Sequence, residues 1–454
     1  MLEAMTLAAV AGPLNGQLHG NEARFTRVVI DSRQVQPADL FVALKGPRFD
    51  GHDFLAQVAA NGAMAALVEQ HQPDVALPQL QVADTRLALG QLGQLNRAAF
   101  RGGLVGVTGS SGKTTVKEML ASILARLGPV LATRGNLNND LGVPLMLLEL
   151  APAHHNAVIE MGASHVGEIA YTVGLARPDV AVLNNAGSAH LGEFGGYENI
   201  VRAKGEIIDG LSADGVAILN RDDPAFDIWV KRAGSRRVIS FGLSPQADFH
   251  ALDIRTDERG CPGFELVRQG ARYRVQLNLL GRHNVSNALA AAAAASALGL
   301  AAEDIQAGLE ALVPVRGRGV AQLTEGGIRV IDDTYNANPA SMRAAVDLLA
   351  SFAAPRIVAL GDMGELGDWA AQAHRELGEY ARGKVEALYG VGPLMAEAVA
   401  AFGPGAEHFD SQEALIAALQ DRLSPGSSLL VKGSRSAAME KVVAVVTGNG
   451  GEVH

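Results

Sequence analysis

The sequence has 454 residues, of which 48% are hydrophobic and 19% are charged. At about 100–200 residues per domain, this length predicts three domains, and the apolar content excludes a disordered chain. The formal net charge of −10 argues against a general nucleic-acid-binding protein, although it is compatible with a local positive pocket for an anionic ligand.

The single cysteine, Cys261, cannot form an internal disulfide, which is typical of a protein of the reducing cytoplasm. The first 23 residues contain no Lys or Arg and include Glu3, a pattern unlike a secretory signal. The longest uncharged apolar stretch, residues 288–302, is shorter than the ~20 residues of a membrane span. We therefore predict a soluble, cytoplasmic protein.

Strand-like and helix-like segments alternate from the start of the chain, which is typical of α/β architecture. In the first section we predict helices at residues 52–65 and 85–100. The predicted strands of this section are residues 25–30, 40–44, 66–68 and 80–82. We place the first domain boundary near Asp84.

The middle section contains short apolar runs that end in polar residues, a pattern typical of buried parallel strands. These predicted strands are residues 104–108, 157–161, 179–183 and 216–219. Alternating residues between 247 and 280 predict a β-hairpin, and a helix is expected at 287–298. Residues 313–319 read as a linker and give the second boundary.

The last section repeats the alternation on a smaller scale. Its predicted strands are residues 329–331, 356–360, 387–391 and 428–431. We therefore predict an α/β protein of three domains at residues 1–84, 85–315 and 316–454. The central domain should have a mainly parallel sheet, and the last should be Rossmann-like.

A glycine-rich loop, Gly106-Val-Thr-Gly-Ser-Ser-Gly-Lys-Thr-Thr115, lies between a predicted strand and a predicted helix. Backbone N–H groups of such a loop and the helix N-terminus bind phosphate. Lys113 can neutralise phosphate charge, and Thr114 can offer a hydroxyl to Mg²⁺. Val107 replaces the first glycine of the strict motif, so the loop is a variant. An ordinary glycine turn is the alternative, and we predict ATP binding.

Two further residues at predicted strand ends are candidates for metal binding, because Mg²⁺ would assist phosphoryl transfer. Glu160 closes an apolar strand, and His190 lies in a glycine-bounded loop. Taken singly, a solvated acid and a hydrogen-bonded loop histidine are the commoner explanations. The phosphate loop favours the functional interpretation of both.

A basic turn in the first section is a candidate phosphate site. Ser32 and Arg33 follow a predicted strand, and Arg48 and His52 lie just before a predicted helix. A surface turn with charged side chains is the alternative.

Several blocks together resemble the Mur ligase family. They are Asp31-Ser-Arg33, Phe49-Asp-Gly-His52, Thr108-Gly-Ser-Ser-Gly-Lys-Thr-Thr115, Thr133-Arg-Gly-Asn-Leu-Asn-Asn-Asp-Leu-Gly-Val-Pro144, Asp332-Asp-Thr-Tyr-Asn-Ala-Asn-Pro339, Leu360-Gly-Asp-Met-Gly-Glu-Leu-Gly367 and Val431-Lys-Gly-Ser-Arg-Ser436. The resemblance covers essentially the whole chain. Folylpolyglutamate synthases share the core fold but not the N-terminal block.

The resemblance implies an ATP-dependent amide ligase of peptidoglycan synthesis, a process on which cell shape and cell division depend. We expect the protein to be a monomer. The blocks match the family member that joins D-Ala-D-Ala to UDP-N-acetylmuramoyl-tripeptide through an acyl phosphate. The three domains would then receive UDP, ATP and the incoming dipeptide in that order. A nucleotide switch and a kinase that forms no amide bond are the rival hypotheses.

The resemblance also implies roles for individual residues. Lys113, Glu160, His190 and Lys204 would be catalytic, and two Mg²⁺ ions would be bound by Thr114, Glu160, His190 and Lys204, the last as a carbamate. ATP would be bound by Gly109, Ser110, Ser111, Gly112, Lys113, Thr114, Thr115, Asn287, Arg318, Asp333, Tyr335 and Asn336. The other substrates would be bound by Ser32, Arg33, Arg48, His52, Asn138, Asn139, Lys432 and Arg435. Without the resemblance, Lys204 reads as a surface helix lysine and Asn287 as a helix cap.

Overall fold

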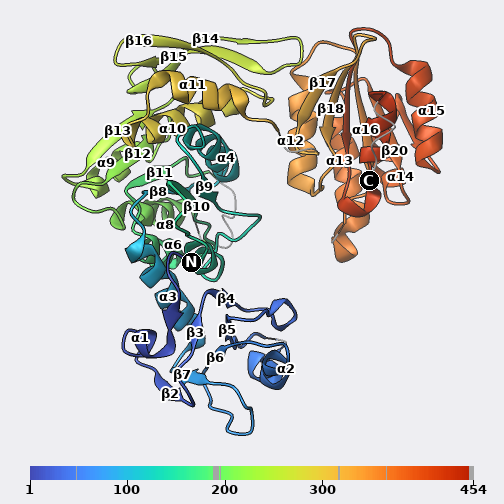
Figure 1. Ribbon diagram of the computed structural model, residues 1–454. Coiled ribbons are helices and arrows are strands. Elements are labelled where there is room, and N and C mark those ends of the chain that lie inside the picture. Colours follow the sequence, from blue (N-terminus) through green and yellow to red (C-terminus); the bar gives the residue numbers. More distant parts are fainter. Residues whose placement is uncertain (48, 188–193, 195, 315–316, 365, 449–454) are drawn as a thin grey trace. The chain divides into compact units, whose positions relative to one another are not determined.

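The computed structural model describes residues 1–47, 49–187, 194, 196–314, 317–364 and 366–448 (Figure 1). The chain separates into two compact units. The first unit comprises Met1–Leu252, Leu266–Tyr273 and Ser286–Ala311, and the second comprises Asp253–Glu265, Arg274–Val285 and Leu312–His454. The three-domain division expected from the sequence stays a prediction.

The first unit begins with a five-stranded sheet of order β2-β7-β6-β5-β4. Strands β4 to β7 pair in parallel, whereas β2 pairs antiparallel with β7. Leu40, Leu67 and Leu80 are fully buried in this sheet, as expected for strands that are covered on both faces. The elements of this part are β1 (Met5–Thr6), α1 (Leu7–Ala11), β2 (Gln17–His19), β3 (Arg24–Phe25), β4 (Arg27–Val29), η1 (Ser32–Gln34), β5 (Asp39–Val42), η2 (Gly51–Phe54), α2 (Leu55–Ala60), β6 (Ala65–Val68), β7 (Gln79–Gln81) and α3 (Thr85–Ala99).

The following section forms a nine-stranded sheet of order β16-β15-β14-β13-β12-β11-β8-β10-β9. From β8 the chain proceeds to β9 and β10 on one side and then to β11 and β12 on the other, all in parallel. The carboxyl end of β8 therefore lies at a topological switch point, where α/β sheets bind ligands. The elements are β8 (Gly103–Thr108), α4 (Lys113–Leu124), β9 (Val130–Ala132), α5 (Gly142–Leu148), β10 (Asn156–Glu160), α6 (Glu168–Ala176), β11 (Val180–Leu183), α8 (Tyr197–Asp209), β12 (Val216–Asn220), α9 (Phe226–Ala233), β13 (Arg237–Phe241), β14 (Phe249–Thr256), β15 (Pro262–Arg268), β16 (Ala271–Gln276), α10 (His283–Ala297) and α11 (Ala302–Ala311).

The second unit contains a six-stranded sheet of order β17-β18-β22-β19-β20-β21. All its neighbours pair in parallel except the edge strand β17, which is antiparallel to β18. The elements are β17 (Val320–Leu323), β18 (Arg329–Asp333), α12 (Pro339–Ala350), β19 (Arg356–Gly361), η3 (Gly367–Trp369), α13 (Ala370–Ala381), β20 (Ala387–Val391), α14 (Met395–Phe402), β21 (Ala406–Phe409), α15 (Gln412–Arg422), β22 (Ser428–Lys432), η4 (Arg435–Ala437) and α16 (Glu440–Val446).

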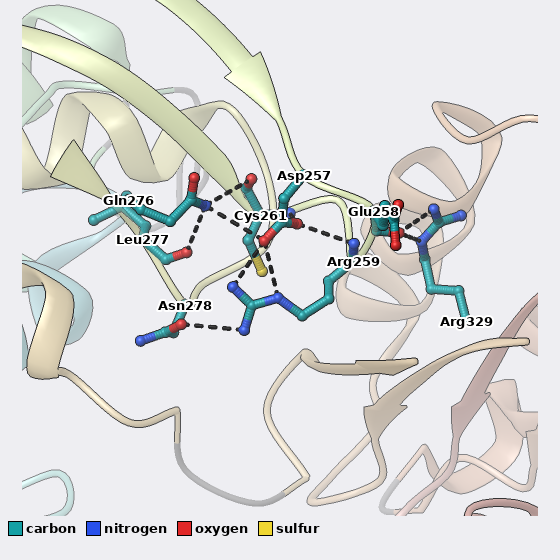
Figure 2. A network of polar contacts seen from close by, with 8 residues as sticks. All are labelled: Asp257, Glu258, Arg259, Cys261, Gln276, Leu277, Asn278 and Arg329. Carbon is teal, nitrogen blue, oxygen red and sulfur yellow. Dashed lines mark hydrogen bonds and ion pairs between the residues drawn. The ribbon is translucent and has the colours of Figure 1, made fainter. Parts of the chain in front are cut away.

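The turn between β14 and β15 also belongs to the second unit, and a polar network holds it (Figure 2). The Asp257 carboxylate accepts hydrogen bonds from the Cys261 backbone N–H at 2.9 Å and from the Arg259 guanidinium. Arg329 on β18 donates through Nε to the Glu258 carbonyl oxygen at 2.8 Å. Cys261 itself is buried in the apolar cluster that contains Ile331. The turn is thus packed into the core of the C-terminal sheet.

We expect the Cys261 thiol to resist alkylation in the folded protein. The side chain is buried, and burial raises its pKa to about 11. At pH 8 only about one thiol in a thousand would be ionised, and thiolate is the reactive form. Reaction with a chromogenic disulfide reagent at pH 8 should be at least about 100-fold slower than in denaturant, where the same sample is the control. Full modification of the native protein within seconds would contradict this packing.

The α/β class and the mainly parallel central sheet are confirmed, but some predicted elements differ. The helix expected at residues 52–65 is shorter, because η2 precedes α2 and the chain turns at Gly62, which has a φ of +88°. The segment expected as one hairpin forms three strands, β14 to β16. In the part of the chain that the structure describes, no helix is long and apolar enough to cross a membrane.

Candidate active site

The phosphate loop joins β8 to α4 at the switch point, as the sequence predicts. Gly109 and Gly112 have φ values of +155° and +76°, which favour glycine. A Cβ at Gly112 would collide with the side chains of Asn184 and Asn287. Glycine is therefore required here both by the backbone conformation and by the close approach of two asparagines. The first N–H groups of α4 lie at the loop, where they can bind an anion.

Lys113, the first residue of α4, folds back over the loop. Its Nζ donates to the Gly109 carbonyl oxygen at 2.8 Å and lies 3.5 Å from the Ser110 carbonyl oxygen. Burial lowers the pKa of Lys113, and the negative charge of Glu160 acts in the opposite direction. An anionic phosphate bound at the loop would stabilise the ammonium form further.

Thr114, the second residue of α4, meets Glu160, the last residue of β10. The Thr114 hydroxyl donates to Glu160 Oε2 at 3.0 Å, and Asn138 Nδ2 donates to Glu160 Oε1 at 2.9 Å. Glu160 is buried, and its backbone N–H donates to Thr133 Oγ1. A hydroxyl and a carboxylate are oxygen ligands of the kind Mg²⁺ prefers, so this pair fits a magnesium site.

His190, the expected nitrogen ligand, lies outside the described residues. Within those residues, no three His, Cys, Asp or Glu side chains gather into a metal cluster. Among the described residues, Thr114 and Glu160 are therefore the pair that fits a magnesium ion.

Lys204 on α8 is buried, unlike an ordinary surface lysine, and 3% of it is exposed. Its Nζ lies 3.3 Å from the Ala163 carbonyl oxygen and 5.3 Å from the centroid of the Phe194 ring. Burial, and next the positive charge of Lys113, lower the pKa of Lys204 to about 8. A substantial fraction of the amine is thus neutral near physiological pH.

Sequence reasoning missed two asparagines that follow β11. The Ser110 backbone N–H donates to the Asn185 carbonyl oxygen, and that of Ser111 donates to Asn185 Oδ1 at 2.9 Å. Asn184 Nδ2 donates to the Ser111 carbonyl oxygen and to Asn287 Oδ1. Both residues follow a buried parallel strand directly, which is the signal that singled out Glu160.

Asn287 is the fifth residue of α10, so the alternative of a helix-start cap is wrong. It lies beside the phosphate loop, as a nucleotide-binding residue should. Ser110 Oγ is 3.4 Å from the Gly187 carbonyl oxygen, and Thr115 lies within the first turn of α4.

A second cluster lies within the C-terminal unit. Lys432 Nζ pairs with Asp333 Oδ2 at 2.6 Å and donates to the Asn336 carbonyl oxygen at 2.9 Å. Burial raises the pKa of Asp333, and the charge of Lys432 opposes this shift. The Arg318 guanidinium lies 4.3 Å from the centroid of the Tyr335 ring. Four expected ATP residues, Arg318, Asp333, Tyr335 and Asn336, thus lie within one group of contacts.

Two expected substrate residues of this unit, Lys432 and Arg435, make contacts within the chain. Lys432 is almost completely buried and its ammonium pairs with Asp333, and its expected role toward the dipeptide or ATP stays a prediction. Arg435 is largely exposed, and Nη1 lies 3.9 Å from Glu440 Oε1.

In the N-terminal sheet, Ser32 and Arg33 form η1 after β4. The Arg33 guanidinium pairs with Asp31 at 2.7 Å while 82% of its side chain is exposed. His52 Nδ1 lies 2.6 Å from Asp50 Oδ1, and its Nε2 accepts from the Glu69 backbone N–H at 2.9 Å. Both ring nitrogens are engaged within the chain, and the expected substrate role of His52 stays a prediction.

Two further substrate residues were expected beside these. Arg48 lies outside the described residues. Asn139 Oδ1 accepts from the Gly142 backbone N–H at 2.8 Å, which holds the turn that leads into α5. Asn138, its neighbour, contacts Glu160 instead and so lies beside the pair of Thr114 and Glu160.

A phosphate loop at the switch point of a parallel sheet, with a hydroxyl and a carboxylate at its side, defines a P-loop enzyme of the α/β class. Three models match the chain: "Mur ligase family, catalytic domain" at residues 24–97, "Mur ligase middle domain" at 107–295 and "Mur ligase, glutamate ligase domain" at 318–435. The chain belongs to the Mur ligase family.

The similarity to known relatives covers nearly the whole length of the chain. The UDP-N-acetylmuramoyl-tripeptide–D-alanyl-D-alanine ligase of Escherichia coli is 45% identical, with 98% of this chain and 99% of that protein covered. The ligase of the same name from Haemophilus influenzae is 39% identical, with 97% of each covered. A crystal structure of MurF from Acinetobacter baumannii has a TM-score of 0.86 at 42% identity, covering 98% of this chain and 99% of that chain. MurF ligase from Thermotoga maritima in complex with ADP has a TM-score of 0.76 at 32% identity, covering 93% and 97%.

Proposed function

We propose that this chain is an ATP-dependent amide ligase that joins D-Ala-D-Ala to UDP-N-acetylmuramoyl-tripeptide and releases ADP and phosphate. The observation that carries the proposal is the phosphate loop with Lys113 above it and the contact between Thr114 and Glu160 beside it. The names of the full-length relatives support the choice of substrates, and the ADP-bound relative supports the choice of nucleotide. The reaction belongs to peptidoglycan precursor synthesis.

The reaction proceeds in two steps. A terminal carboxylate oxygen of the tripeptide attacks the γ-phosphorus of ATP, and the bond from that phosphorus to the β,γ-bridging oxygen breaks to release ADP. The amine of D-Ala-D-Ala then attacks the carbonyl carbon of the acyl phosphate. The tetrahedral intermediate expels inorganic phosphate, and the nitrogen loses a proton to give the amide. Lys113 and the N-terminus of α4 stabilise the charge on the transferred phosphoryl group.

Mg²⁺ supplies neutralisation of phosphate charge when it is bound. Thr114 and Glu160 would hold it, and Asn138 would orient the Glu160 carboxylate through the hydrogen bond to Oε1. We infer that Lys204 carries a carbamate and, with His190, holds a second Mg²⁺. A buried amine of lowered pKa supports this inference, because CO₂ reacts with the neutral amine.

We also propose that the substrates are divided among three domains. Residues 1–84 would receive UDP, 85–315 would bind ATP, and 316–454 would receive the dipeptide. A monomer in the cytoplasm is the expected form, and the single buried cysteine is compatible with a reducing compartment.

The function is tested by measuring ADP formation with the nucleotide tripeptide and D-Ala-D-Ala present together and singly. A ligase should require both for sustained turnover and should form the UDP-linked pentapeptide, detected by mass. Sustained turnover without the dipeptide would indicate a nucleotide switch. Phosphate retained on the product would indicate a kinase. Lysine and diaminopimelate forms of the tripeptide should be used in separate reactions, and the form with the larger kcat/KM identifies the preferred acceptor.

We expect Arg33→Ala to raise the KM for the UDP-linked substrate by about 10-fold, with kcat and the KM for ATP within two-fold. The exposed guanidinium can contribute charge-assisted bonds to a diphosphate. Arg255→Ala is a matched control, because Arg255 also pairs with an aspartate two residues earlier and has 78% of its side chain exposed. An unchanged KM in Arg33→Ala would remove Arg33 from the proposed UDP site.

A further inference from the structure

Asn184 lies directly beneath the phosphate loop, and 2% of the residue is exposed. It follows the last residue of β11, and its backbone carbonyl oxygen accepts from Asn220 Nδ2 at 2.9 Å, which anchors its main chain to the adjacent strand. Its backbone N–H donates to the Thr108 carbonyl oxygen at 2.9 Å. The side chain is thus presented from a rigid strand end.

The carboxamide of Asn184 joins two parts of the nucleotide site. Nδ2 donates to the Ser111 carbonyl oxygen at 2.9 Å and to Asn287 Oδ1 at 3.0 Å. Both partners are acceptors, so only the amino end of Asn184 can face them. The bond to Asn287 spans 103 residues of sequence. Together with the bond to Ser111, it connects the phosphate loop to α10 through Asn184.

Two observations indicate that this arrangement serves a purpose beyond packing. Asn184 Oδ1 is buried and has no hydrogen-bond partner within the described part of the chain, a cost that a purely structural residue would not need to bear. The loop glycines also fit around it: a Cβ at Gly109 would lie 3.0 Å from Asn184 Cβ, and one at Gly112 would collide with its amide.

We propose that Asn184 is a positioning residue for nucleotide binding. By donating to Ser111 and to Asn287 at once, it fixes the shape of the phosphate loop and the orientation of the Asn287 carboxamide. The phosphate loop, which would bind the phosphates, and Asn287, which would bind another part of the nucleotide, are thereby held in a fixed relative position. This inference rests on the proposed function only in taking the ligand of the loop to be an adenine nucleotide.

The inference is tested by titrating Mg-ADP into the full-length protein by calorimetry. Asn184→Ala should raise the Kd at least 10-fold, since two hydrogen bonds that preorganise the site are lost. Asn184→Asp keeps the shape but cannot donate, so it should weaken binding at least as much. In the complete reaction, the KM for ATP should rise in parallel, with the KM values of the other substrates within two-fold.

Asn96→Ala is the matched control. Asn96 is a buried asparagine of α3 that likewise donates two hydrogen bonds from Nδ2, to Leu147 and Leu150, and it contacts neither the loop nor Asn287. It should lower Tm and leave the Kd for Mg-ADP within two-fold. A merely structural role for Asn184 would produce the same pattern in both variants.

A double-mutant cycle with Asn287→Ala completes the test. If Asn184 acts through Asn287, the two substitutions should not be additive. The fold-increase in the Kd for Mg-ADP of the double variant should then be less than half the product of the fold-increases of the two single variants. Independent effects, or a Kd within two-fold of wild type in folded Asn184→Asp, would overturn the proposal. Because the readout is ADP binding, a wild-type protein that binds ADP but forms no amide would refute the proposed function and leave this test valid.

Discussion

Replacing Lys113 with alanine should lower kcat of the complete reaction by about 10²–10³-fold, the usual loss when one preorganised electrostatic contact is removed. The ammonium lies 2.8 Å from the Gly109 carbonyl oxygen, so it is held over the loop where the phosphate charge would develop. Burial already lowers the pKa of Lys113, because partial desolvation disfavours the charged amine. The measurement is the rate of ADP formation at saturating concentrations of all three substrates.

The fold should tolerate this change, because Lys113 is only half-buried and lies at the first position of α4. A Tm within a few degrees of wild type is the required control. Lys113→Met, which retains the length of the side chain without the charge, separates the loss of charge from the loss of volume. A folded alanine variant that keeps more than about a tenth of the wild-type rate, a barrier change below about 1.4 kcal/mol, would contradict the assignment.

The strands and the phosphate loop were predictable because they are local features. An apolar run that ends in a polar residue marks a parallel strand and its functional end, and this signal located both β8 and β10. The same signal follows β11 at Asn184 and Asn185, so these residues could have been singled out. What the sequence cannot give is their partner, since the bond from Asn184 to Asn287 joins α10 to a loop 103 residues away.

Two of the predicted substrate residues are already engaged in contacts within the chain, and their substrate roles stay predictions. His52 and Lys432 carry the chemistry expected of phosphate or carboxylate ligands, but both are buried and hydrogen-bonded within the chain. The sequence shows that a residue with suitable chemistry is present, but only the structure shows whether its donors and acceptors are already bonded to other groups of the chain. Lys204 is a further example, because its helical sequence context predicts a surface lysine, whereas the structure shows that it is buried.

Replacing Lys204 with alanine should also remove most of the activity, by about 10²-fold or more if the side chain supplies a charge beside the metal. With a pKa of about 8, about half of the amine is neutral at pH 8, compared with about 0.3% for a lysine of ordinary pKa 10.5. The neutral fraction rises with pH, so carbamate formation should be favoured between pH 7 and 9 and lost toward pH 6. Intact-mass measurement under bicarbonate, with wild type and Lys204→Ala compared, should reveal an added carboxylate on the wild type alone.

Chemical rescue of Lys204→Ala separates the two charge states of the native side chain. A carbamate is an anion, so acetate or another small carboxylate that enters the vacated space should restore part of the activity, whereas chloride at equal ionic strength should not. An unmodified ammonium predicts the reverse, because only small amines would then replace it. The sign of the charge decides the outcome, since an anion beside a magnesium site lowers the free energy of metal binding and a cation raises it. Nearly full activity of the alanine variant without additives would leave Lys204 as a buried structural lysine that contacts the Ala163 carbonyl oxygen and the Phe194 ring.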